Sequence, residues 1–140
     1  MTAMAEERGT VTLWLLGLCV VLLFLGGLTL DLWRAFSERR ALAGVVDAAA
    51  AAGASGIDVA AFRATGHVAL DPAAAEALAA DNLAAHNDLP SLTAVTLSAS
   101  PAAITVEATG AVDLTLTKLL LDPVPLTIRV TATAEPAASP

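Results

Sequence analysis

Aromatic residues are scarce in this 140-residue chain, which contains no tyrosine, three phenylalanines and two tryptophans. Proteins that bind single-stranded nucleic acid commonly stack its bases on aromatic side chains. The shortage of such side chains therefore argues against a stacking surface for bases.

Basic residues are also few, and they are unevenly distributed. Residues 1–40 contain four acidic and four basic residues, whereas residues 41–140 contain ten acidic and three basic residues, so the whole net charge of −7 comes from the second part. An acidic surface repels phosphate backbones. We therefore expect no nucleic-acid partner.

Side chains that carry catalytic or metal chemistry are sparse as well. The single cysteine, Cys19, lies in an apolar run and is interpreted as a small hydrophobic residue. The histidines, His67 and His86, are 19 residues apart and have no cysteine nearby, a spacing that predicts no metal site. The chain has neither a G-x-S-x-G motif nor a glycine-rich phosphate loop. We predict no catalytic residue, no metal and no cofactor, and expect that the protein is not an enzyme.

What the sequence does contain is a long apolar run, Gly9 to Leu30, with 22 consecutive uncharged residues. A helix of about 20 apolar residues matches the hydrocarbon thickness of a bilayer. The rest of the chain has too little apolar bulk to cover such a helix on all sides. The run therefore predicts a transmembrane helix and a lipid bilayer as partner.

A cleavable secretory signal is the main alternative, because Ala41-Leu42-Ala43 resembles a cleavage site. That site lies far beyond the apolar run, with charged residues in between, and the run is longer than a usual signal. A lipoprotein signal needs a small residue before the cysteine, whereas Leu18 precedes Cys19. A membrane anchor is the better interpretation.

The helix is expected to continue past the membrane, from about Val11 to Ala52, because no proline interrupts it before Gly53. Asp31 and Arg34 follow the apolar run at a spacing of three, so their opposite charges can pair on the helix surface. Alternatively, Asp31 faces a charge on a partner. Apolar residues recur on one face of this extension at Leu32, Ala35, Phe36, Ala43, Val46, Ala49 and Ala50.

A second helix is predicted after an irregular connection over residues 53–70, which contains at most a short turn at residues 59–63. Asp71 is a typical N-cap, Pro72 suits the first turn, and Pro90 prevents continuation beyond about Asn87. The predicted apolar face comprises Ala75, Leu78, Ala79 and Leu83.

From Leu92 onward the apolar residues alternate with threonine, serine and charged residues, which predicts strands with one buried face. Turns are expected at residues 98–102 and 121–125, and Gly110 is expected to mark a bulge or a bend in the middle strand. The predicted fold class is α+β, with a long N-terminal transmembrane helix, an amphipathic continuation, a second helix and a three- or four-stranded antiparallel meander. The expected segments are 1–8 (cytoplasmic), 9–30 (transmembrane), 31–54 (helix extension), 55–134 (head) and 135–140 (disordered tail).

The first third of the chain resembles TadE/TadG-like proteins of tight-adherence (Flp) pilus systems. The matching features are Arg8-Gly9, the apolar span to Leu30-Asp31, and the alanine-rich stretch over residues 45–54; basic residues lie between them at Arg34, Arg39 and Arg40. The resemblance implies a minor pilin-like subunit or assembly component, with other pilin-like subunits and the tight-adherence membrane apparatus as partners.

The resemblance also implies a cellular location for the protein and a step that cleaves its N-terminus. It puts the protein in the inner membrane with its C-terminal bulk outside the cytoplasm, whereas the arginines after the span slightly favour the opposite orientation. It implies cleavage by a prepilin peptidase at Gly9-Thr10. Many such precursors have glutamate where Trp14 stands here.

Gly17, Gly26 and Gly27 would allow helices to pack closely in the membrane, although G-x-x-x-G spacing is missing. Alternatively, these glycines simply face lipid. Together with Asp31 and Arg34, these glycines are the predicted interface. A different class of function also fits the sequence, namely a single-pass anchored module whose extracytoplasmic head binds a partner at a free sheet edge.

Overall fold

The computed structural model describes residues 3–86, 92–114 and 125–137, with backbone only for residues 3–9. It contains three helices and three strands in these ranges, which confirms the predicted α+β class. In chain order they are α1 (Ala3–Gly53), α2 (Val59–Thr65), α3 (Pro72–Ala85), β1 (Leu92–Ala99), β2 (Ile104–Val112) and β3 (Leu126–Ala134).

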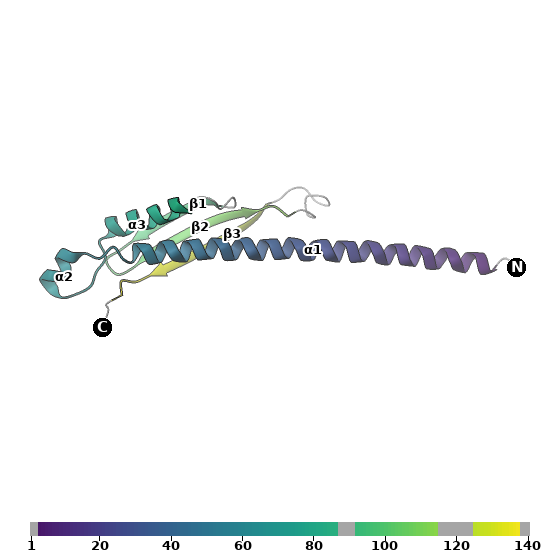
Figure 1. Cartoon of the computed structure of the whole chain (residues 1–140), viewed down its shortest axis with the longest axis horizontal. Coiled ribbons are helices and arrows are strands. Elements are labelled where there is room, and N and C mark those ends of the chain that lie inside the picture. Colours follow the sequence, from purple (N-terminus) through teal and green to yellow (C-terminus); the bar gives the residue numbers. More distant parts are fainter. Residues whose placement is uncertain (1–2, 87–91, 115–124, 138–140) are drawn as a thin grey trace.

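Helix α1 is a rod that carries the rest of the molecule at one end (Figure 1). Its 51 residues span about 75 Å at the standard helical rise. The N-terminal half extends away from the other elements, whereas the C-terminal half lies along the sheet. The continuous helix predicted from the sequence is confirmed, although it begins at Ala3 rather than near Val11.

The two short helices begin at aspartate caps. Asp71 Oδ1 accepts hydrogen bonds from the backbone N–H groups of Ala73 and Ala74, at 3.0 and 3.3 Å, as predicted for this N-cap. Asp58 accepts from Ala61 N at 2.9 Å and starts α2. The predicted short turn is therefore a seven-residue helix, which ends at Gly66 with a left-handed φ of 74°.

The strands form an antiparallel sheet in the order β1-β2-β3. The predicted turn after β1 is present, since Ser100 N donates to Ala103 O at 2.9 Å. A bulge occurs at this level of the sheet, but it lies in β1 and not in β2, where Gly110 predicted it. Gly110 keeps its regular pairing with Ile128, and the register shift lies opposite it in β1, between Leu92 and Ala94. The second predicted turn, at residues 121–125, lies outside the described residues except for Pro125.

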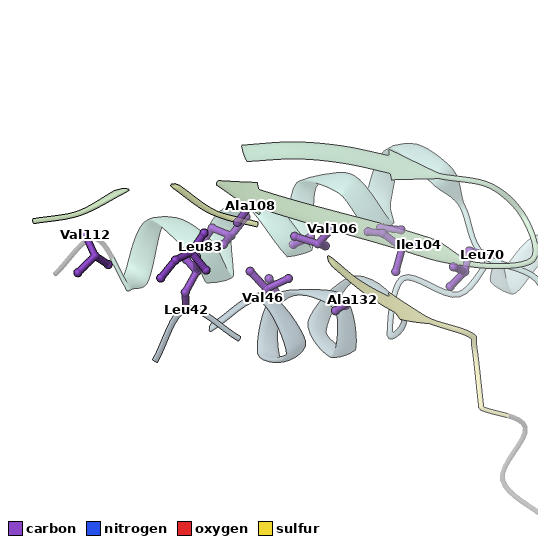
Figure 2. Close-up of a cluster of buried hydrophobic side chains, with 14 residues drawn as sticks. Leu42, Val46, Leu70, Leu83, Ile104, Val106, Ala108, Val112 and Ala132 are labelled. Atoms are coloured by element: carbon purple, nitrogen blue, oxygen red, sulfur yellow. The ribbon is translucent and has the colours of Figure 1, made fainter. Parts of the chain in front are cut away.

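The core lies between one face of the sheet and the helices α1 and α3, so the head has two layers (Figure 2). Alternate residues of β2 point into it and are buried, as the period-two pattern predicts. The largest fully buried side chains come from α1, β2 and the loop before α3: Leu42, Val46, Leu70, Ile104 and Val106.

Three predicted core positions are wrong. Leu32, Phe36 and Leu78 are exposed. The buried hydrophobic residues of α1 begin at Leu42 and continue through Val46, Ala49 and Ala50, whereas Leu32 and Phe36 precede this packed part of the helix. In α3 the buried residues are Ala75, Ala79 and Leu83, which places Leu78 off the contact face.

Candidate membrane-association surface

The N-terminal half of α1 exposes apolar side chains around its whole circumference. Leu13, Leu23 and Leu30 are 71%, 76% and 70% exposed, and none of the most apolar window of the helix is buried. Within the parts of the chain that the structure describes, α1 is the one helix long and apolar enough to cross a membrane. A bilayer is the medium in which such a surface is stable.

One polar side chain of this stretch forms its hydrogen bond within the helix. The Thr29 hydroxyl donates to Leu25 O at 2.8 Å, the back-bonding expected of threonine in an apolar helix. An unpaired polar group in hydrocarbon would cost several kcal/mol. The internal hydrogen bond therefore suits an apolar environment.

The predicted interface glycines do not form one surface. Gly17 and Gly26 each have no atom within 4 Å of an added Cβ. They lie nine positions apart, which at about 100° per residue puts them on opposite faces of the helix. Beside Gly17 the surface has a shallow apolar depression next to Trp14. The glycines thus offer two faces for close approach.

Asp31 and Arg34 lie where the part of α1 that no other element covers meets the head. Asp31 is only 4% exposed, whereas Arg34 is exposed. Trp33, between them, is 75% exposed, a position that suits an aromatic side chain at a membrane interface. The pairing of Asp31 with Arg34 stays a prediction.

A groove lies at the same junction, between α1 and the start of β3. We call it the junction groove; its volume is about 370 Å³. Residues that line it include Leu28, Asp31, Leu32, Phe36 and Arg39 from α1, Leu114 just after β2, and Leu126 and Arg129 from β3. The sequence did not predict it, because its two walls are some ninety residues apart in the chain.

Other reactive side chains have structural roles or are scattered. The Ser55 hydroxyl donates to Ala52 O at 2.6 Å at the end of α1, and His86 Nδ1 lies 2.8 Å from Asn82 O at the end of α3. His67 is exposed. No group of three or more histidine, cysteine or acidic side chains is placed to hold a metal ion within the described residues.

The candidate processing bond, Gly9-Thr10, lies inside α1. Its cleavage stays a prediction.

Comparison with known proteins identifies the region that contains this surface. A family model described as Flp pilus-assembly TadE/G-like matches residues 9–56, which covers most of α1 and the turn after it. No curated protein sequence and no solved structure matches the chain. The matched family is a pilus-assembly family rather than an enzyme family. The resemblance stated from the sequence is thereby confirmed: residues 9–56 form a TadE/G-like N-terminal region.

Proposed function

We propose that the protein is a single-pass TadE/G-like subunit or assembly component of a Flp pilus or related secretion apparatus. One observation carries the proposal. The helix that matches the family is bare and apolar at one end and forms part of the core of a small α+β head at the other. Such a molecule tethers its head rigidly to a bilayer, without a flexible linker.

The family resemblance and the charge of the head support a proposal for the orientation. We propose that the head lies outside the cytoplasm and that α1 crosses the inner membrane. The arginines after the span favour the reverse, but Arg8 and the amino terminus on the other side reduce that bias. Residues 41–140, which include the head, contain ten acidic and three basic residues. The anionic lipids of the cytoplasmic leaflet would repel a part of the chain with this charge.

Lateral association through α1 is the proposed way in which the subunit meets its partners, which are other pilin-like subunits and membrane proteins of the apparatus. Gly17 and Gly26 open opposite faces of the helix, so one helix can contact two neighbours. Close approach of helices in lipid is stabilised by packing and favoured by small residues.

The experiment that tests this role is deletion of the gene in its native cell, followed by complementation. The intact chain is expected to restore Flp pili on electron micrographs, and a chain with Gly26→Leu and Gly27→Leu is expected not to. The matched control carries Val20→Leu and Val21→Leu, which add bulk at exposed span positions without filling a glycine site. Normal pili in the deletion strain would contradict the proposal and favour the binding-module hypothesis.

Processing at Gly9-Thr10 is a separate proposal. A prepilin peptidase would leave Thr10 as the first residue, and intact-mass measurement of the protein isolated from membranes would show the loss of residues 1–9. A mass that includes these residues would contradict cleavage and leave the anchoring role unaffected.

A further inference from the structure

The junction groove has one apolar end and one basic end. Its apolar end is formed by Leu28 and Leu32 on α1 and by Leu126 at the start of β3; all three are substantially exposed. Arg39 on α1 and Arg129 on β3 lie farther along the same groove. Both elements run away from the bare end of α1 (Figure 1), so the apolar end is the one nearer the membrane.

The groove is continuous with the proposed membrane span. Leu28 belongs to the uncharged run that ends at Leu30. Trp33 marks the interface, and Arg39 lies six residues beyond it, about 9 Å along the helix axis. Side chains on a helix lean toward its N-terminus, which here is the membrane side. The Arg39 guanidinium therefore reaches back toward the headgroup layer.

The basic end of the groove keeps a net positive charge, because Arg39 and Arg129 lie there with one carboxylate, that of Glu107, beside them. Arg129 Nε lies 3.1 Å from Glu107 Oε1, a contact that uses one of the five N–H donors of the guanidinium. The buried Asp31 carboxylate lies among the apolar residues at the other end and would repel a phosphate there. The groove is thus apolar near the membrane and basic farther from it, which matches the order of acyl chains and phosphates in a phospholipid leaflet.

We propose that the junction groove binds one anionic phospholipid of the bilayer, with an acyl chain along Leu28, Leu32 and Phe36 and the phosphate at Arg39 and Arg129. The volume of about 370 Å³ is in the range of small-molecule sites, roughly 300–1,000 Å³. Arginine is suited to phosphate because its planar donors can bind two oxygens at once. This inference depends on the membrane anchoring proposed above.

The site would do more than add affinity for the bilayer. A lipid held between α1 and β3 fills the gap between the rod and the edge of the sheet, so it fixes the height of the head at the membrane surface. Lipid composition would then influence how firmly the head is held.

The test is lipid retention by the full chain, measured by native mass spectrometry. The protein is first reconstituted in vesicles containing equal parts of dioleoyl-phosphatidylglycerol and dioleoyl-phosphatidylcholine, and is then released in a mild detergent. We expect one phosphatidylglycerol bound in preference to phosphatidylcholine. In a chain carrying Arg39→Gln and Arg129→Gln, this retention should fall at least tenfold. Both arginines are exposed, so the substitutions should leave the core intact.

The matched control carries Arg40→Gln and Arg63→Gln, which remove the same charge from exposed positions outside the groove. Equal losses in the two variants, or equal retention of both lipids by the unchanged protein, would overturn the proposed site. Alkaline extraction of the same vesicles separates this outcome from a failure of anchoring. A chain removed from the vesicles by alkali would overturn the membrane anchor as well, whereas an inserted chain without bound lipid would overturn only the lipid site.

Discussion

At the scale of single residues, Gly56 allows close packing where the turn after α1 meets α3. A Cβ on Gly56 would lie 2.8 Å from Ala75 N and 2.9 Å from its Cα. Backbone atoms cannot rotate away as a side chain can, so Gly56→Ala must push α3 outward. We expect a loss of about 1–3 kcal/mol in the free energy of unfolding, the usual cost of overpacking.

The matched control is Gly44→Ala, because an added Cβ at Gly44 has no atom within 4 Å. Alanine is favoured over glycine inside a helix, so this substitution should stabilise the protein by roughly 0.5–1 kcal/mol. Urea unfolding of the full chain in a non-denaturing detergent, followed by circular dichroism, gives both values. A gain in stability for both variants would show that α3 is not held against Gly56.

The Asp71 cap is a second residue-scale prediction. Asp71→Ala removes the acceptor for two N–H groups of the first turn of α3, and loss of an N-cap typically costs about 1 kcal/mol. Hydrogen exchange at Ala73 and Ala74 should accelerate accordingly. Asp81→Ala, at an exposed position inside α3, should leave these amides unchanged, and equal acceleration in the two variants would contradict the capping role.

Residues whose role is local could be predicted from the sequence, and residues whose role depends on tertiary packing could not. Asp71 and Pro72 were identified correctly because capping involves only neighbouring residues. Leu42 was missed and Leu78 was wrongly placed in the core. Burial of a helix position depends on where the sheet crosses the helix, which the periodicity of an alanine-rich segment does not define.

At the scale of elements, the main finding is that α1 is both the exposed apolar rod and a wall of the head. Leu42 and Val46 are fully buried against the sheet. A fragment that begins at residue 55 would therefore lack part of the core. The helix extension at residues 31–54 was expected from the absence of proline, but its last three turns pack inside the head.

This dual role predicts unequal costs for two leucine truncations. Leu42 is 1% exposed and Leu78 is 40% exposed. Leu42→Ala should destabilise the head by about 2–5 kcal/mol, whereas Leu78→Ala should change stability by only about 0.5 kcal/mol. The measurement is the hydrogen-exchange protection of β2 amides in the detergent-solubilised chain. Similar costs for the two substitutions would mean that α1 does not contribute to the core.

The sheet shows the same division between local and long-range information. Alternation of apolar and polar residues predicted all three strands and the buried face of β2, whereas no residue of β1 is fully buried. The strand that carries the bulge was not predicted, because a register shift depends on the partner strand. Gly110 indicated where the irregularity occurs, and only the pairing shows that the extra residue belongs to β1.

At the scale of the whole molecule, the chain is a rod about 75 Å long with a small acidic head around its C-terminal third (Figure 1). The apolar run and the family resemblance could be recognised in the sequence, since both lie in one continuous segment. The junction groove could not, because it joins α1 to the start of β3. The groove lies where the head would meet the bilayer.

The central claim is that α1 holds the head against the outer surface of the inner membrane. It is tested most directly by cysteine labelling in spheroplasts with a membrane-impermeant maleimide. Cys19 is first replaced by alanine, and Ser98, exposed on β1, is replaced by cysteine; a second chain carries Thr10→Cys at the other end of the span, a position that the proposed processing would keep. We predict that the cysteine at position 98 is labelled before lysis and the one at position 10 only after lysis. The reverse pattern would contradict the proposed topology.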